Sequence, residues 1–319
     1  MRVGQNPAKF VKKVAQPERI TVAVLNYIPF LSGFYAEMLD VLDTSLSSLR
    51  EGADIPYDLL VFDNGSCPEA REYLLKEQEA GNIQYLLLSD VNLGKGGAWN
   101  MILSGAPGEI IVYADNDVLY YPGWLSKSLE LLETYPKVGM VTARPFRTRP
   151  DVYSSTVAWG EGQDDVAVTH GDFIPYETFE EFDLSLGQSV EEIREHYDTS
   201  EDVKLVYKGL EAIAGASHWQ FMAWKSVLQE YLPFSMDRPM GQVKQLDERM
   251  NQAGYLRLMP TEPYVMNISN TLRGLNEDKM TGGDVKSAEK KYPVLDFPPV
   301  KRALMFLYNR IFHWYYDRQ

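Results

Sequence analysis

Cysteine is almost absent from this sequence of 319 residues, in which Cys67 stands alone. A single thiol excludes an intramolecular disulfide framework and any structural zinc site built from several thiolates. Long apolar runs are also missing. No stretch approaches the roughly 18 consecutive apolar residues of a membrane span, and the first residues lack the apolar core of a signal peptide. We therefore expect a cytoplasmic protein that does not cross a membrane on its own.

Positive charge is in short supply, because 31 Lys and Arg residues face 45 Asp and Glu residues, which gives a net charge of −14. This balance argues against nucleic acid as a partner. The deficit is concentrated in residues 161–202, which hold fourteen acidic residues and one basic residue, Arg194. Residues 1–19 form a basic arm instead. It suits either a membrane surface or, as we favour, a leader that packs on the acidic surface or frays.

Apolar residues make up 45% of the chain, enough for a large core. Short apolar runs alternate with helical patterns up to residue 117, and this alternation is typical of a doubly wound, mostly parallel α/β sheet. We expect strands in ITVAVLNY, YDLLVFD, IQYLLLSD and EIIVYADND, and helices over 34–50, 68–80 and 97–104. Ligands bind at the carboxyl ends of the strands in such sheets. We also expect short helices at 176–184 and 189–198, although the fold of the acidic segment cannot be derived.

The end of the fourth apolar run carries Asp115, Asn116 and Asp117. In an extended chain, residues two apart project to the same side, so the two carboxylates would share one face. Adjacent carboxylates repel unless a cation lies between them, and their oxygens suit Mg²⁺ or Mn²⁺ with a phosphate as a further ligand. The alternative is a solvated turn. The position at a strand end favours a metal that holds a diphosphate.

Two more polar segments follow strand ends. Asp63 and Asn64 precede Gly65, where the carboxylate could accept hydrogen bonds from a base or a ribose, or simply cap the next helix. Residues 92–100 (NLGKGGAWN) supply glycines for close backbone approach and Lys95 for a phosphate. This stretch matches neither the dinucleotide fingerprint nor the P-loop, which argues against dehydrogenases and NTPases.

Taken together, VAVLNY, VFDNGS, NLGKGGAWN and YADNDVLYYPGW resemble the family 2 glycosyltransferases, which have the GT-A fold and use nucleotide-diphosphate sugars. The resemblance covers residues 20–145. It implies a Rossmann-like, mostly parallel sheet flanked by helices, an acceptor-side elaboration over 146–270 and a C-terminal helix. It also implies inverting transfer, with Mn²⁺ or Mg²⁺ on Asp115 and Asp117. The expected nucleotide-sugar contacts are Asn26, Tyr27, Asp63, Asn64, Gly94, Lys95, Asp115 and Asn116, and a UDP-sugar is the favoured donor.

An inverting transfer needs a general base near the acceptor hydroxyl. The family places an acidic pair before a helix, but Gln242 and Val243 occupy those positions here. Asp247 lies one turn further along, on the same helical face as Val243, and we choose it as the base over Glu248. An interpretation of Asp247 and Glu248 as solvated carboxylates on the helix surface is almost equally good. Asp237 is a third candidate.

His218 precedes Trp219 on the expected acceptor side, and we assign it as a third metal ligand or a diphosphate contact, although a lone histidine is usually structural. Trp219 could stack on a sugar ring, but packing in the core is the more common fate of a tryptophan.

We therefore expect a metal-dependent glycosyltransferase that acts on a glycan, lipid-linked or small hydroxylated acceptor. The alternatives are a non-catalytic nucleotide-sugar or glycan-binding module and a sugar nucleotidyltransferase. Residues 271–319 would hold a loop (270–292) that closes over the donor and an amphipathic helix (299–318). That helix suits peripheral contact with the inner face of a membrane, but packing against the body better explains its many large residues.

Overall fold

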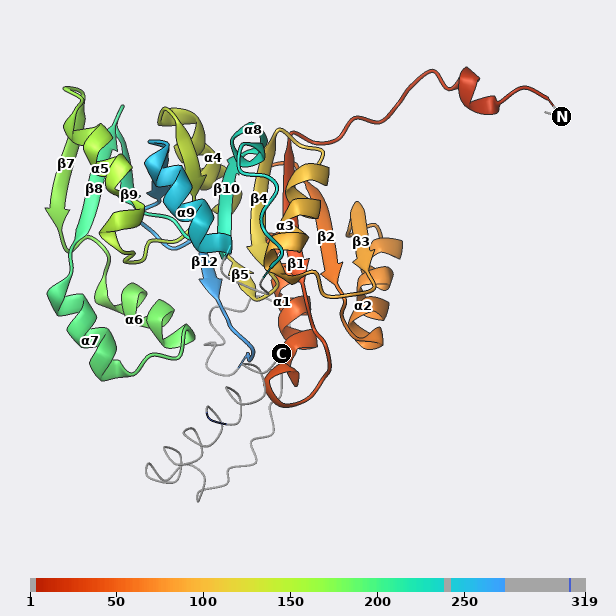
Figure 1. Ribbon diagram of the computed structural model, residues 1–319, viewed down its shortest axis with the longest axis horizontal. Coiled ribbons are helices and arrows are strands. Elements are labelled where there is room, and N and C mark those ends of the chain that lie inside the picture. The colour runs from red at the N-terminus through yellow and green to blue at the C-terminus, as the bar shows by residue number, and fades with distance from the viewer. Residues whose placement is uncertain (1–3, 238–241, 273–309, 311–319) are drawn as a thin grey trace. The chain divides into compact units, whose positions relative to one another are not determined.

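The computed structural model describes residues 4–237, 242–272 and 310. Strands and helices alternate through the first part of the chain, as the apolar pattern predicts (Figure 1). The elements there are β1 (Ile20–Asn26), α1 (Met38–Gly52), β2 (Asp58–Asn64), α2 (Pro68–Glu79), β3 (Tyr85–Ser89), α3 (Gly94–Gly105), β4 (Ile110–Asp115), β5 (Val118–Tyr120), α4 (Trp124–Thr134) and β6 (Val138–Val141).

The second part is less regular, and it opens on the acidic segment. Its elements are α5 (Ser154–Glu161), β7 (Val166–Gly171), α6 (Tyr176–Ser185), α7 (Val190–Thr199), β8 (Asp202–Tyr207), β9 (Leu210–Ala214), β10 (Gln220–Trp224), α8 (Lys225–Gln229), α9 (Gln242–Gln252), β11 (Leu256–Met259) and β12 (Val265–Asn267). Short 3₁₀ turns lie at Pro7–Phe10, Gly33–Tyr35 and Pro150–Val152. The two helices expected in the acidic segment are therefore present as α6 and α7.

Ten strands of the described residues form one sheet in the order β3-β2-β1-β4-β10-β6-β11-β9-β8-β7. The first four are parallel, and β10, β9 and β7 run against the others. Seven strands thus share one direction, which confirms the expected mostly parallel α/β class. Figure 1 shows β10, which belongs to the predicted acceptor half, lying between β4 and β6 of the predicted donor half, so one sheet joins the two halves. A separate pair, β5 and β12, is antiparallel.

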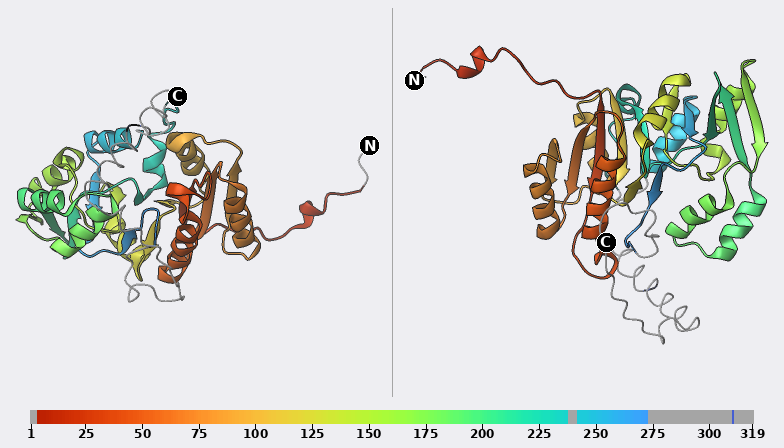
Figure 2. Two further views of the ribbon diagram at one scale, coloured as in Figure 1. Left: turned by 90° about the horizontal axis from the view of Figure 1, so that it is seen from below. Right: turned by 180° about the vertical axis from the view of Figure 1, so that it is seen from behind.

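The first strands are continuous apolar runs because both faces of the sheet are covered there. All seven residues of β1 are buried, as expected for a parallel strand covered on both faces. One face packs against α3, α8 and α9, with Trp99 of α3 in edge-to-face contact with Tyr113, Phe221 and Phe234. The aromatic contacts fix α3 over the strand that leads to Asp115. The turned views in Figure 2 show the helices packed around the sheet.

Several expectations fall at the ends of the chain. Residues 4–19 are exposed up to the start of β1, including Phe10, Val11 and Val14, so the packing suggested for this arm is not present in its described part. The expected helix at 299–318, apart from residue 310, and most of the loop at 270–292 lie outside the described residues. No helix in the described part of the chain has both the length and the apolar character of a membrane span.

Candidate functional site

Three parallel strands bring their polar ends to one edge of the sheet. The register pairs Asn26 of β1 with Asp63 of β2, and Leu25 of β1 with Asp115 of β4. Because parallel strands end at the same side, the sequence motifs after β1, β2 and β4 meet there. The sequence therefore predicted correctly that these polar segments gather at one edge of the sheet.

Asn26 is the centre of a buried hydrogen-bond network. Its Nδ2 donates to Asp63 Oδ1 and to Ser66 Oγ, both at 3.0 Å, and its Oδ1 accepts from Asn116 Nδ2 at 2.7 Å. The residue is 0% exposed. Asn26 thus ties the ends of β1, β2 and β4 together and fixes the turn that carries Asn116.

Asp63 is enclosed in the same way, with 0% exposure. Its Oδ2 accepts from the Ser66 backbone N–H at 3.2 Å and from Arg71 Nε at 3.1 Å, and Arg71 also donates to the Ser89 carbonyl at the end of β3. A contact between Asp63 and a nucleobase would require these bonds to be exchanged. In this geometry Asp63 positions Asn26, Ser66 and Arg71. The sequence suggested instead that Asp63 faces the nucleobase of the donor.

Asn64 holds the loop before α3. Its Oδ1 accepts from the Leu93 backbone N–H at 2.8 Å, and its Nδ2 donates to Asn92 Oδ1 at 3.0 Å. Gly65 next to it has φ +87°, and a Cβ there would lie 2.9 Å from the Asn92 backbone nitrogen. Only glycine fits both conditions.

Lys95 lies in the first turn of α3, because the helix begins at Gly94, three residues earlier than expected. Its ammonium lies 2.9 Å from the Asp115 carboxylate and over the rings of Trp99 and Tyr113, at 5.8 and 5.5 Å from their centroids. The side chain is 13% exposed. Tyr113 donates its hydroxyl to Asp115 Oδ1 at 2.6 Å. A positive charge is therefore already held against the first carboxylate of the motif.

Asp117 does not lie in an extended strand. β4 ends at Asp115 and a turn follows, so the argument from strand alternation was wrong, although the two carboxylates still lie near each other. Burial, together with the charge of Asp115, raises the pKa of Asp117 to about 7. Asp117 Oδ1 is buried and has no hydrogen-bond donor.

A buried, unpartnered carboxylate oxygen beside a second carboxylate fits a divalent cation. Among the described residues, no group of three or more His, Cys, Asp or Glu side chains could hold a metal. A metal on Asp115 and Asp117 would therefore take its other ligands from a phosphate or from water.

The acceptor-side candidates lie beside this edge. β10 runs antiparallel to β4, and the Asp115 N–H donates to the Trp219 carbonyl at 2.9 Å, so His218 lies near the Asp115 turn. However, His218 Nδ1 is turned to Asp247 Oδ2 at 3.3 Å, and Asp247 Oδ1 lies 2.7 Å from Arg257 Nη2. The structure thus brings the proposed third ligand and the proposed base into contact with each other.

The remaining candidates lie near the surface or in the core. Glu248 forms an exposed pair with Lys244 at 3.5 Å, and Asp237 is exposed and accepts from Ser235 Oγ at 2.6 Å. Trp219 is 8% exposed and stacks on Phe182 of α6 at 5.6 Å, so packing is the correct interpretation of this residue.

Sequence reasoning missed two features of the site. Arg257 in β11 is 0% exposed and holds Asp247. An arginine within the apolar run YLRLMP was the available signal, because a buried guanidinium needs an anion. The second feature is an aromatic group after β1, in which the rings of Tyr27, Phe30 and Phe34 lie around Tyr35 at 5.1 to 6.4 Å.

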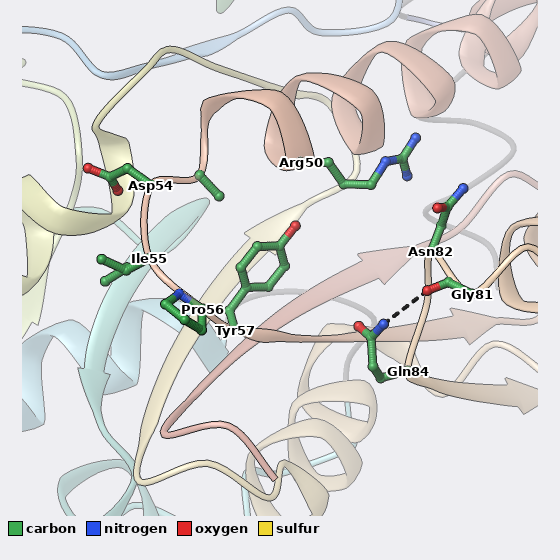
Figure 3. Close-up of a pocket in the computed structure, with 9 residues that line it drawn as sticks. Arg50, Asp54, Ile55, Pro56, Tyr57, Gly81, Asn82 and Gln84 are labelled. Atoms are coloured by element: carbon green, nitrogen blue, oxygen red, sulfur yellow. Dashed lines mark hydrogen bonds between the residues drawn. The ribbon is translucent and has the colours of Figure 1, made fainter.

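Hollows also lie elsewhere among the described residues, including one of about 500 Å³ lined by Pro107, Trp224 and Gln229. One of about 430 Å³ is lined by Arg50, Tyr57 and Gln84 among others, at the amino end of β2 (Figure 3). Another, of about 1020 Å³, lies between α5 and α7 and includes His170 and His196. None of these hollows is lined by Asp115 or Asp117, so the carboxyl edge of the sheet remains the candidate site.

Comparison with known proteins supports the resemblance drawn from the motifs. Residues 33–176 match the family model described as Glycosyl transferase family 2. An uncharacterised glycosyltransferase of Nostoc is 25% identical over 123 residues, which are 39% of this chain and 35% of that protein. The chain thus spans about a third of the length of this curated relative. The resemblance to family 2 glycosyltransferases is confirmed over the matched residues.

Solved structures show weaker likeness. A mannosyltransferase from Pyrobaculum calidifontis, in complex with GDP-Man and Mn²⁺, has a TM-score of 0.48 at 17% identity, over 84% of this chain and 63% of that one. Residues 1–349 of TarS from S. aureus, in complex with UDP, give a TM-score of 0.46 at 12% identity, over 78% and 60% of the two chains.

Proposed function

We propose that this chain, which matches the glycosyl transferase family 2 model over residues 33–176, is a metal-dependent inverting glycosyltransferase. The observation that carries the proposal is the pair Asp115 and Asp117, in which a buried carboxylate oxygen lacks any donor. These two residues would hold Mn²⁺ or Mg²⁺, which would stabilise the negative charge of a leaving diphosphate. The donor is a nucleotide-diphosphate sugar, with a UDP-sugar as the expected class.

The chain's own residues have distinct tasks in this proposal. Lys95 at the start of α3 contributes a cation for the diphosphate, and the N–H groups of the same helix turn face an anion favourably. Asn26, Asp63 and Asn64 hold the three loops in place through their hydrogen bonds. The acceptor hydroxyl would approach from the side of β10 and α9 and lose its proton to a base there. The acceptor is a glycan or another hydroxylated molecule.

Thermal unfolding with a panel of nucleoside diphosphates, with and without Mn²⁺, tests this proposal. We expect one diphosphate, with Mn²⁺ present, to stabilise the protein, because a ligand at 100 times its Kd adds about 2.7 kcal/mol. The variant Asp115→Asn serves as the control and should lose this response. Equal stabilisation without metal, or none with any diphosphate, would contradict the proposal.

The non-catalytic alternative rests on Gln242 and Val243, which stand where the family has an acidic pair. It predicts the same diphosphate response without any release of diphosphate from the sugar donor. A nucleotidyltransferase would instead release pyrophosphate from a nucleoside triphosphate. Product analysis therefore separates all three.

The substitution Lys95→Met gives a second prediction. The ammonium now competes with a metal for Asp115, so its removal should tighten the binding of Mn²⁺ alone and weaken the binding of the diphosphate. Titration calorimetry of each ligand measures both effects. Lys76, which pairs with Glu72 on the surface, supplies the control variant Lys76→Met, and it should change neither affinity. Parallel losses of both affinities would show that Lys95 and the metal do not compete.

A further inference from the structure

Three polar side chains, those of His218, Asp247 and Arg257, contact one another beside the candidate site. His218 comes from the segment before β10, Asp247 from the middle of α9 and Arg257 from β11. Their side chains are 35%, 12% and 0% exposed, respectively. Exposure thus rises in order from the arginine to the histidine, which is the member that solvent or a substrate can reach.

Each oxygen of Asp247 faces a basic side chain. Oδ1 lies 2.7 Å from Arg257 Nη2, and Oδ2 lies 3.3 Å from His218 Nδ1. Arg257 cannot easily move away, because it also donates to the carbonyls of Ala216 at 2.6 Å and Val152 at 3.3 Å. Oδ1 is buried in this ion pair without forming a hydrogen bond, so an acceptor hydroxyl cannot reach it, and at Oδ2 the hydroxyl would have to displace His218. Asp247 therefore suits an orienting role better than the role of the base.

The contact with Asp247 also decides which nitrogen of His218 is available. When Nδ1–H donates to a carboxylate, the lone pair lies on Nε2 at the far side of the ring, and the carboxylate stabilises the imidazolium that forms on protonation. The base and its orienting partner are thus in hydrogen-bond reach, as general-base catalysis requires.

The position of His218 places it at the proposed site. Gln220, two residues later, pairs with Ala114 of β4, and the Trp219 carbonyl accepts from the Asp115 N–H. Figure 1 shows β10 directly beside β4. The chain entering β10 therefore passes the turn that carries Asp115 and Asp117.

We propose that His218 is the general base of the transfer and that Asp247, held by Arg257, orients it. This inference rests on the proposed function. His218 Nε2 takes the proton of the acceptor hydroxyl as its oxygen bonds to the anomeric carbon. The bond between that carbon and the diphosphate oxygen breaks, and the nucleoside diphosphate leaves with the electron pair. The imidazolium then loses its proton to solvent.

The test uses sugar donors that carry the nucleoside diphosphate identified by the stability panel, and it measures release of that diphosphate with water and methyl glycosides as acceptors. We expect His218→Ala to lower kcat by roughly 10²–10⁴-fold. Its diphosphate-dependent stabilisation should stay at the wild-type value, and added imidazole should restore part of the rate. Glu248→Gln, an exposed carboxylate on the same helix, is the control and should leave the rate unchanged.

Asp247→Asn should lower kcat with little change in the KM for the donor. ¹⁵N NMR of the histidine ring should show that this substitution also removes the preference for a proton on Nδ1, a change that a purely structural role would not produce.

A folded His218→Ala variant that releases diphosphate at the wild-type rate would overturn the inference and leave the proposed function intact. Loss of metal-dependent diphosphate binding in His218→Ala would also overturn the inference, because it would indicate that His218 binds the metal or the diphosphate. No release by the wild-type protein would instead refute the proposed transfer itself.

Discussion

Replacing Asp117 with asparagine should stabilise the metal-free protein at pH 8 and at the same time abolish metal-dependent donor binding. Burial and the charge of Asp115 raise the pKa of Asp117 from 3.8 to about 7. A carboxyl group with a raised pKa in the folded state stabilises the fold below its unfolded pKa, and this stability is lost as the pH rises through 7. At pH 8 the wild-type protein therefore carries a buried charge that the asparagine variant lacks.

The expected gain at pH 8 is about 2–4 kcal/mol, because one pKa unit corresponds to about 1.4 kcal/mol. Urea unfolding from pH 4 to pH 8 measures it, and the gap between variant and wild type should narrow toward pH 4. Mn²⁺ with the diphosphate should stabilise only the wild type. Asp165→Asn, an exposed carboxylate before β7, should match the wild type throughout. Equal stability of Asp117→Asn and wild type at every pH would refute the account of the buried charge.

The same substitution should lower the rate of transfer by roughly 10²–10³-fold or more, since a bound metal supplies several kcal/mol of charge stabilisation. A more stable but inactive variant is the expected signature of a site that carries unfavourable charge for function. An active Asp117→Asn enzyme would remove this residue from the metal site.

The meeting of these polar segments at one edge of the sheet was predictable from sequence, because buried parallel strands have continuous apolar runs as their sequence pattern. Each of the runs ending near Asn26, Asp63 and Asp115 became a parallel strand, and parallel strands end at one edge. The helix starting at Gly94 was also near its expected place. Local patterns were sufficient for these features, since each depends on residues close together in the chain.

The roles of the residues at that edge were not predictable, because they depend on partners far apart in sequence. Asp63 accepts from Asn26, 37 positions earlier, and Asn26 accepts from Asn116, 90 positions later. Helical spacing gave the face of Asp247, but only the packing of β11 beneath α9 supplies Arg257 as its counter-ion. Polar contacts between residues far apart in the chain produce no periodic pattern in the sequence, so they cannot be predicted from it.

The acidic segment is the clearest case of this limit. Its composition suggests repulsion, and its only basic residue, Arg194, lies over the ring of Tyr176. The positive charge that holds the acidic segment together belongs to Arg147, a residue outside the segment. Arg147, 2% exposed, pairs with Asp202 at 2.8 Å and with Asp172 at 2.8 Å, and it donates to the carbonyls of Tyr197 and Ser200, both at 2.6 Å.

Asp202→Ala should therefore be strongly destabilising. Asp202 is 3% exposed and accepts from Arg147 and from the N–H groups of Phe173 and Ile174 at 2.8 and 2.9 Å. Its loss leaves a buried guanidinium without its main anion and two backbone donors without an acceptor. Breaking one partner of a buried pair costs about 3–5 kcal/mol. Urea unfolding should show this loss, and hydrogen exchange should place the largest increase in β7, β8 and α7.

Asp172→Ala is the matched control, because Asp172 contacts the same guanidinium at the same distance but its side chain is 62% exposed. Solvent screens the charge of a carboxylate that is this exposed, and Asp202 still pairs with the guanidinium, so the loss of Asp172 should cost less than about 1 kcal/mol. Similar losses in both variants would mean that the charge of Arg147, and not the burial of Asp202, sets the cost. Because the segment joins the site through the stacking of Phe182 on Trp219, Asp202→Ala should also weaken acceptor-side turnover more than diphosphate binding. A larger effect on turnover than on diphosphate binding would show that the acidic segment supports the acceptor side and not the donor site.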